Sequence, residues 1–269
     1  MSHVPVLLKE VLEVLQPAPG KVFVDGTANG GGHSTALREH GARVIMIELD
    51  PDLAQQIGAI HGNYADIATL VREQVDGVLL DLGFSSQQLE SGRGFSFQKD
   101  EPLDMRYNYE EGKTAADILN TRSEEEIARI LKEYGEERFD GRIASAIVRH
   151  RPITTTFQLV RAIESVVPRR GKIHPATRTF QALRIAVNHE LENLQKGLEG
   201  AVKIAPIVAV ITFHSLEDRI VKKFVRHRAG GPASVVAGKP IKARWEEVKM
   251  NRRARSAKLR VVERTTPAK

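Results

Sequence analysis

Short, largely apolar runs recur through the first part of the chain and are separated by segments of mixed character. The runs are Val22–Val24, Val44–Ile47 and Val75–Leu80. Runs of this kind are typical of strands buried on both faces of a parallel sheet, and amphipathic segments between them are typical of covering helices. The pattern therefore predicts an α/β domain, preceded by an N-terminal helix over Pro5–Leu15.

From Leu103 onward the pattern becomes helical alone. Ser123 and Glu126 form a capping box ahead of one amphipathic helix, and Pro152 and Pro168 end two others. A single long helix is predicted to carry one apolar stripe of Phe180, Leu183, Val187, Leu191, Leu194 and Leu198. The strand pattern returns at Ile207–Phe213 and Ala257–Glu263. We therefore predict a sheet domain in two parts, residues 1–104 and 191–269, interrupted by a helical insert at 105–190.

A glycine-rich turn, DGTANGGGHS at residues 25–34, follows the first predicted strand directly. Glycine allows positive φ and close backbone approach, and the next helix offers unpaired N–H groups to a ligand. No register of these glycines gives the Gly-x-Gly-x-x-Gly spacing of a dinucleotide fingerprint. A P-loop is also excluded, because no Lys follows the last glycine. A ligand with a ribose and little phosphate fits better.

Three acidic residues stand at the ends of the three predicted strands: Asp25, Glu48 and Asp81. The carboxyl ends of parallel strands meet at one edge of the sheet, where ligands bind. An acid at the end of the second strand accepts hydrogen bonds from ribose hydroxyls, which is the role expected of Glu48. Asp50–Pro51 is predicted to start the next helix, with Asp50 as its cap.

The amino-acid composition excludes several kinds of catalytic and metal-binding site. The chain has 269 residues, 41% of them hydrophobic and 28% charged, as in ordinary globular proteins. It contains no cysteine, which excludes thiolate metal sites and cysteine nucleophiles, including the usual route to a methylated pyrimidine carbon-5. If the chain methylates a pyrimidine, an exocyclic nitrogen is the expected target. The nine histidines lack ligand spacing, so no metal site is predicted.

Positive charge is concentrated near the C-terminus. Residues 219–264 contain fifteen lysines and arginines against three glutamates, whereas the whole chain has a formal net charge of +6. A solvated helix face is the alternative explanation of this charge, but the arginine-rich cluster favours phosphate contacts and nucleic acid as partner. The residues expected to bind RNA are Arg252, Arg253, Arg255 and Lys258, with Arg178 and Arg184 on a polar helical stripe. The longest apolar stretch, Ile204–Phe213, is too short to cross a membrane, and the N-terminus lacks a signal segment, so a cytoplasmic location is expected.

Nine motifs along the chain together resemble the bacterial 16S rRNA cytosine-N4-methyltransferases. In order they are HVPVLLKEVL, DGTANGGGHS, DLGFSS, RGFSF, PLDMR, YGEER, HPATRTFQALRI, FHSLEDR and RSAKLR. The resemblance spans nearly the whole chain. It implies a Rossmann-like class I methyltransferase sheet with a helical insert, S-adenosylmethionine as cofactor, and a cytidine in the decoding region of the small ribosomal subunit as target.

The resemblance also implies roles for particular residues. The cofactor would be bound by Asp25, Gly31, Gly32, His33, Glu48, Tyr64, Asp81 and Gln88. Among these, Glu48 would take the ribose where the family more often has Asp, Tyr64 would lie against the adenine, and Gln88 would close the pocket. Asn29 stands where the family usually has Gly, and Asn is the side chain that best tolerates positive φ.

The predicted catalytic residues are Asp81, Phe84 and His214. Asp81 would accept hydrogen bonds from the target amine and Phe84 would stack on an extruded base. Ser215 and Asp218 also fit a helix capping box, so a structural role for this region competes with one in which His214 or Glu217 faces the base. Two other functions stay open: a related amino-methyltransferase acting on another RNA or DNA, and a non-catalytic RNA-binding ribosome assembly factor.

Overall fold

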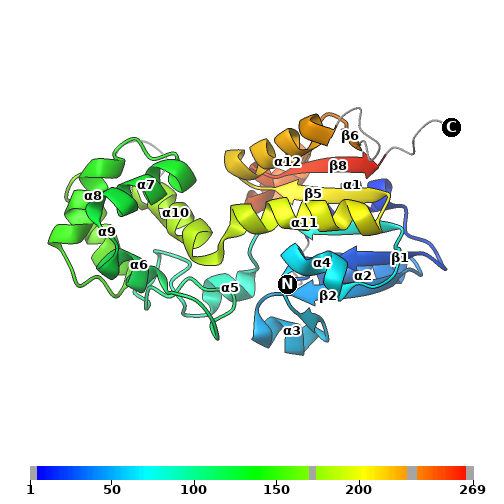
Figure 1. Ribbon diagram of the computed structural model, residues 1–269, viewed down its shortest axis with the longest axis horizontal. Coiled ribbons are helices and arrows are strands. Elements are labelled where there is room, and N and C mark those ends of the chain that lie inside the picture. The colour runs from blue at the N-terminus through cyan, green and yellow to red at the C-terminus, as the bar shows by residue number, and fades with distance from the viewer. Residues whose placement is uncertain (1–4, 170–173, 229–234, 265–269) are drawn as a thin grey trace. The chain divides into compact units, whose positions relative to one another are not determined.

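The computed structural model describes residues 5–169, 174–228 and 235–264. The chain forms two compact units, one built from residues 1–83 and 191–269 and the other from residues 84–190. Figure 1 shows the sheet of the first unit and the helices of the second. The predicted α/β sheet with a helical insert is confirmed.

The sheet has the strand order β3-β2-β1-β4-β5-β8-β6, and β7 also pairs with β8. The strands from β1 to β5 pair in parallel, whereas β8 runs antiparallel to β5 and to β6 and β7. Their bounds are β1 Val22–Asp25, β2 Arg43–Glu48, β3 Ile60–His61, β4 Gly77–Asp81, β5 Ile207–Thr212, β6 Val235–Ala237, β7 Ile241–Lys242 and β8 Lys258–Arg264. The chain therefore returns to the sheet after the insert, next to the strand that it left.

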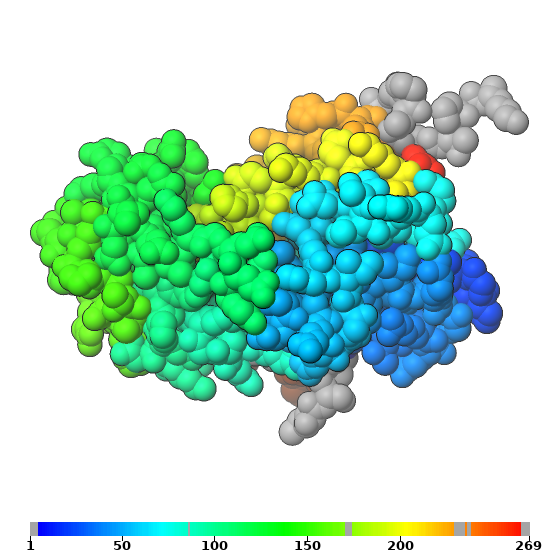
Figure 2. Space-filling view, turned by 60° about the horizontal axis from the view of Figure 1, so that its bottom comes forward, coloured from blue at the N-terminus to red at the C-terminus, as the bar shows by residue number. Residues whose placement is uncertain are grey.

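Helices cover both faces of this sheet because the central strands are apolar on both sides. One face packs against α4 (Ile67–Leu70), α11 (Glu190–Ile204) and α12 (Ser215–Arg228). The other packs against α1 (Leu8–Leu15), α2 (Gly32–Glu39) and the 3₁₀ helix η2 (Arg252–Arg255). Two further helices complete the unit, α3 (Pro51–Ile57) and α13 (Trp245–Met250). In Figure 2 the early residues in cyan lie against α11 in yellow.

The second unit is helical and has its own apolar core. Its helices are α5 Ser86–Glu90, α6 Ala115–Thr121, α7 Glu124–Gly135, α8 Asp140–Arg149, α9 Thr156–Glu164 and α10 Ala176–Asn188. The predicted capping box is present at the start of α7, where the Ser123 hydroxyl accepts from the Glu126 N–H and the Glu126 carboxylate accepts from the Ser123 N–H.

Two features differ from the sequence-based expectation. The helical unit begins at Phe84 rather than at 105, because Phe95, Leu103 and Met105 pack into its core. The predicted long helix is two helices, α10 and α11. The helical conformation is interrupted at His189, which adopts a left-handed conformation with φ of 51°. An apolar stripe that continues across the break gives no sign of it in the sequence.

Candidate functional site

Three neighbouring parallel strands end in a carboxylate at the same edge of the sheet. Asp25 is the last residue of β1, Glu48 of β2 and Asp81 of β4. In the sheet register Asp25 lies opposite Met46 on β2 and Leu79 on β4, two residues before the acidic end of each strand. The sequence-based expectation that these three acids gather at one edge matches this register.

The glycine-rich turn follows β1 at this edge and is held by its neighbours. The Gly26 N–H donates to the Leu79 carbonyl on β4, and the Ala28 N–H donates to the Ile47 carbonyl on β2. Gly31, with φ of 76°, precedes α2 in the left-handed region that favours glycine. The turn therefore places the first turn of α2 beside the ends of β2 and β4.

Glu48 is deeply buried, with 4% of its surface exposed, and it accepts backbone hydrogen bonds through both oxygens. Oε2 accepts from the Asn29 N–H at 2.7 Å and Oε1 from the Asp50 N–H at 2.9 Å. Desolvation raises the pKa of Glu48 to about 7 against these hydrogen bonds. As predicted, Asp50 caps α3, accepting from the Asp52 and Leu53 N–H groups ahead of Pro51.

Asp25 is fully engaged by the protein. Oδ2 accepts from the Ser34 hydroxyl at 2.6 Å, and Oδ1 accepts from the Thr27 N–H at 3.3 Å. Burial raises the pKa of this carboxyl despite those bonds. These contacts tie the start of α2 to the end of β1, so Asp25 shapes the turn through its internal bonds.

Asp81 differs, because one of its oxygens is buried without a partner among the described residues. Its backbone N–H donates to the Thr27 hydroxyl at 2.6 Å, and Oδ2 lies 3.6 Å from Nδ1 of His33. The other ring nitrogen of His33 lies 3.0 Å from the Val6 carbonyl. Oδ1 has neither solvent contact nor hydrogen bond. Desolvation raises the pKa of Asp81 to about 6, while His33 and a backbone hydrogen bond from Gly83 to the carboxylate oppose the shift.

Tyr64 lies in η1 (Tyr64–Asp66), which follows β3 next to β2. A methyl group added at Gly197 on α11 would come within 2.5 Å of its ring. The bare backbone at Gly197 therefore lets the helix lie directly against Tyr64. Tyr64 was expected in the site only from the family resemblance, and Gly197 was not predicted at all, although a glycine within an amphipathic helix signals close packing.

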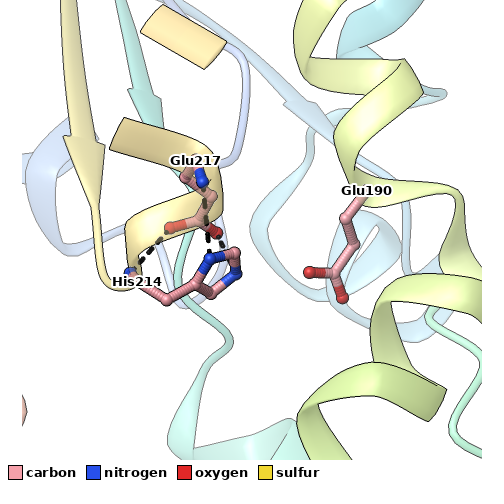
Figure 3. A group of neighbouring side chains, drawn as sticks. All are labelled: Glu190, His214 and Glu217. Atoms are coloured by element: carbon pink, nitrogen blue, oxygen red, sulfur yellow. Dashed lines mark hydrogen bonds and ion pairs between the residues drawn. The ribbon is translucent and has the colours of Figure 1, made fainter. Parts of the chain in front are cut away.

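His214 follows β5 and contacts Glu217 in the first turn of α12 (Figure 3). Glu217 Oε2 accepts from the N–H groups of Phe213 and His214, at 2.7 and 3.2 Å. In return the Glu217 N–H donates to Nδ1 of His214 at 3.4 Å, and Nε2 lies 3.1 Å from Oε1 without hydrogen-bond geometry. Because α12 begins at Ser215, His214 occupies the cap position that the sequence analysis gave to Ser215.

Within the helical unit, Phe84 lies under Arg184. The guanidinium carbon of Arg184 is 4.8 Å from the ring centroid, and Glu190 binds the same guanidinium at 2.8 and 3.0 Å. Tyr107 adds a hydroxyl bond of 3.2 Å to Glu190. Gln88 lies in α5, where its side chain and that of Ser85 form a capping box. Both Phe84 and Gln88 belong to the helical unit.

The polar stripe on α10 has internal partners. Arg178 donates to the Glu136 carbonyl at 2.8 Å, Gln181 to the Tyr134 carbonyl at 3.0 Å, and Asn188 to the Met105 carbonyl at 2.7 Å. Arg178 and Gln181 therefore help to fix the end of α7 against α10, Asn188 helps to fix the loop 91–112, and Arg184 instead pairs with Glu190.

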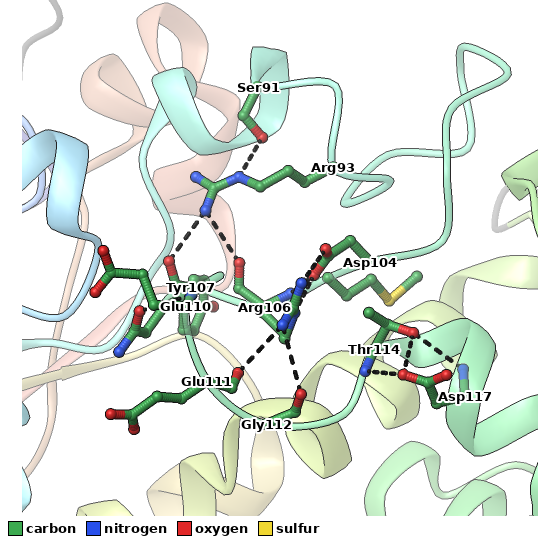
Figure 4. Close-up of polar contacts among 12 residues, drawn as sticks. Ser91, Arg93, Asp104, Arg106, Tyr107, Glu110, Glu111, Gly112, Thr114 and Asp117 are labelled. Atoms are coloured by element: carbon green, nitrogen blue, oxygen red, sulfur yellow. Dashed lines mark hydrogen bonds and ion pairs between the residues drawn. The ribbon is translucent and has the colours of Figure 1, made fainter.

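The motifs RGFSF and PLDMR build that loop from arginine contacts (Figure 4). Arg93 donates to the carbonyls of Arg106 and Tyr107, at 3.1 and 3.0 Å. Arg106 makes two bonds of 2.7 Å to Asp104. Met105, between them, has a φ of 63°, which is costly for a non-glycine residue. These bonds hold the backbone in that conformation.

The basic residues near the C-terminus divide into two groups. Arg252 and Arg255 are exposed on η2, where Arg253 is half-buried. Lys258 instead pairs with Asp218 at 3.3 Å, beside the buried pair of Asp218 and Arg260 at 2.6 Å. Desolvation opposes ionisation of Asp218, but bonds from Arg260 and Lys222 outweigh it and lower its pKa to about 2.

Sequence comparison decides the family. A profile described as the MraW methylase family matches residues 1–265. The chain belongs to the MraW methylase family. Three relatives each carry the name ribosomal RNA small subunit methyltransferase H. The protein from Deinococcus radiodurans is 50% identical, over 98% of this chain and 90% of its own. Those from Methylococcus capsulatus and Pelobacter propionicus are 46% and 45% identical, over 96% and 98% of this chain and 99% and 98% of theirs.

Family membership agrees with the resemblance drawn from the nine motifs, which lie within the matched residues. Among the helices of the described ranges, none has the length and apolar character needed to cross a membrane.

Proposed function

We propose that this chain transfers a methyl group from S-adenosylmethionine to the exocyclic N4 of a specific cytidine in the decoding region of 16S rRNA. Family membership and the names of the relatives support methyl transfer to small-subunit rRNA. The observation that carries the proposal is Oδ1 of Asp81, a buried acceptor at the carboxyl edge that makes no hydrogen bond within the described structure. Leaving such a group unsatisfied is costly, so we expect a bound molecule to donate to it.

The residues around the edge fit a ligand with a ribose and an amino-acid tail. Glu48 would accept from the ribose hydroxyls, and the backbone of Gly31, Gly32 and His33 would contact the methionine part. Tyr64 would lie against the adenine, and Asp25 would act by holding the turn through Ser34 and Thr27. Gln88 is proposed to close the pocket. S-adenosylmethionine, when bound, supplies a methyl group on a positively charged sulfur.

The protein must promote attack by a weak nucleophile. The lone pair of a cytosine N4 is delocalised into the ring, so acceptors that hold the amine hydrogens would localise it. Asp81 and the Leu82 carbonyl are proposed as those acceptors. As the new bond from nitrogen to the methyl carbon forms, the electron pair of the carbon–sulfur bond would stay on the sulfur, and the amine would release one proton to water. Positioning then supplies most of the rate enhancement.

Two further residues are proposed to contact the base. Phe84 would stack on it, using a face of the ring that Arg184 leaves free or displacing Arg184. His214 would face it, held in place by Glu217. The six proposed RNA contacts are Arg178, Arg184, Arg252, Arg253, Arg255 and Lys258, of which Lys258 also pairs with Asp218. A cytoplasmic location stays part of the proposal.

The test is to incubate the protein with labelled S-adenosylmethionine and assembled small subunits, naked 16S rRNA, or DNA, and then to map the modified nucleoside. Label on N4 of one cytidine in the decoding region supports the proposal. Label on DNA or elsewhere in RNA favours the related amino-methyltransferase, and binding without transfer favours the assembly factor. Label on carbon-5 would contradict the argument from the absence of cysteine.

Asp81 is tested separately by Asp81→Ala, measured at saturating cofactor. We expect turnover to fall by at least about 100-fold, the scale seen when a preorganised transition-state contact is removed. The matched control is Asp76→Ala, which removes a carboxylate from the residue immediately before β4, where it accepts from the Val22 N–H. Near-normal turnover in Asp81→Ala would remove Asp81 from the acceptor role.

A further inference from the structure

The connection between β7 and β8 lies at the same edge of the sheet as the carboxylates. β7 and β8 pair so that Lys242 lies opposite Lys258, and Lys258 lies opposite Thr212, the last residue of β5. Because β5 is parallel to β4, its end marks the carboxyl edge of the sheet. Residues 243–257, which contain α13 and η2, therefore leave and re-enter the sheet beside the proposed active site.

This connection is anchored on one side. Val248 packs against the core that includes α1, and Ala254 is buried in the same core. Glu247 adds a hydrogen bond of 2.7 Å, accepting from the N–H of Leu7 at the start of α1. These contacts fix which side of α13 faces inward.

The other side exposes an aromatic ring among cations. Trp245 is 70% exposed and Met250 is 87% exposed. The Lys249 ammonium lies 5.3 Å from the centroid of the Trp245 ring. Residues 239–258 contain eight lysines and arginines against two glutamates. Large exposed apolar side chains commonly mark interaction surfaces.

We propose that Trp245 stacks on an unpaired nucleobase of the RNA that flanks the target cytidine, while exposed Arg252 and Arg255 bind its phosphates. This inference rests on the proposed function and names how the substrate is held. Aromatic side chains within a basic groove are the usual platform for single-stranded nucleic acid. Protein–protein interfaces, in contrast, are depleted in lysine, so the charge around Trp245 favours RNA as the occupant.

The chain contains one tryptophan, so its fluorescence reports on this position alone. We expect titration with a single-stranded oligoribonucleotide of the decoding-region sequence to quench the fluorescence. Trp245→Ala should weaken binding of that RNA by roughly 5- to 150-fold, the range for loss of one stacked base. Trp245→Phe keeps a stacking ring and should retain most of the affinity.

The matched control is Phe157→Ala, which removes another exposed aromatic side chain, at the start of α9 beside Asp100. It should leave RNA affinity within about twofold, since one stacked base is worth at least about 5-fold. The inference is overturned if RNA neither quenches Trp245 nor binds Trp245→Ala less tightly. It is also overturned if Trp245→Ala weakens binding to assembled subunits but not to the single-stranded RNA, because Trp245 then does not stack on an unpaired base of that RNA.

Methyl transfer by the wild-type protein is measured in parallel. If methyl transfer is observed but RNA neither quenches Trp245 nor binds Trp245→Ala less tightly, the stacking role of Trp245 is refuted and the proposed function stands. Quenching by RNA without transfer to any substrate refutes the proposed function and leaves the RNA contact standing.

Discussion

The backbone N–H of Asn29 donates a 2.7 Å hydrogen bond to Oε2 of Glu48, linking the glycine-rich turn to the end of β2. Asn29 reaches this geometry with φ of 49°, and its side-chain amide donates to the Thr27 carbonyl at 2.9 Å. Asn29, where the resemblance implies a Gly, thus adopts a left-handed conformation. The turn tolerates the exchange because Asn adopts positive φ more readily than other non-glycine residues.

Substitutions at Asn29 should therefore separate backbone conformation from side-chain identity. Asn29→Gly is expected to keep S-adenosylmethionine affinity within a few-fold, whereas Asn29→Val should weaken it by about 10-fold, since a β-branched residue at positive φ costs about 1–2 kcal/mol. Calorimetric titration with the cofactor measures both. Equal affinity of Asn29→Val and the wild type would show that the turn is not needed in this conformation.

The raised pKa of Glu48 predicts pH-dependent cofactor binding. Hydrogen bonds from ribose hydroxyls favour the carboxylate, so affinity should fall as the pH drops through about 7. Below that pH, binding should release a proton, seen as a binding enthalpy that depends on the buffer. Glu48→Gln should bind weakly and lose this dependence. A wild-type affinity that stays constant from pH 8 to pH 5.5 would contradict the assignment.

The raised pKa of Glu48 also determines how the stability of the folded protein changes with pH. The folded protein keeps a proton on Glu48 up to about pH 7, whereas the unfolded chain loses it near 4.5. Stability of the cofactor-free protein should therefore fall as the pH rises through this window and level off above it, by about 3 kcal/mol from this group. Urea unfolding at several pH values measures the change.

Gly197 predicts a steric effect on Tyr64. A Cβ there would lie 2.5 and 2.7 Å from two ring carbons of Tyr64, so Gly197→Ala must displace the ring or the helix. We expect weaker cofactor binding, with a larger effect on KM for S-adenosylmethionine than on kcat. Gly141→Ala, on α8 with open space around the added carbon, is the control. An unchanged KM in Gly197→Ala would contradict the proposed contact between Tyr64 and the cofactor.

The buried pair of Asp218 and Arg260 predicts that substituting Asp218 lowers stability rather than catalytic activity. Asp218→Ala would leave Arg260 buried without its carboxylate partner, which should lower the free energy of unfolding by about 3–5 kcal/mol. Lys222→Ala removes a pair whose lysine is 55% exposed and should cost less than about 1 kcal/mol. Urea unfolding distinguishes them, and similar values for both variants would contradict the buried-pair argument.

Much of the sheet unit could be predicted from the sequence, because its strands are apolar and each of three ends in an acid. Val22–Val24 and Val44–Ile47 lie within β1 and β2, and the predicted cap at Asp50 is present. β3 and β7 have two residues each and β6 has three, so none forms an apolar run as long as those of β1 and β2, and none was predicted from the sequence.

What the sequence could not predict are contacts between distant residues. The break at His189 is set where Asn188 binds the Met105 carbonyl, 83 positions earlier, and no local pattern records that bond. The positive charge of Lys258 predicts an RNA contact, yet its pairing with Asp218 depends on β8 lying beside α12. The partners of Asp81 likewise follow from the fold, since Thr27 and His33 reach it from the turn after β1.

The sheet places β5 directly beside β4, although the helical unit separates them in the chain. While a ribosome is still translating that unit, the hydrogen-bonding edge of β4 has no strand to pair with. An open edge invites pairing with other chains. In a nascent chain the edge of β4 therefore stays unpaired until residues 207–212 have been synthesised.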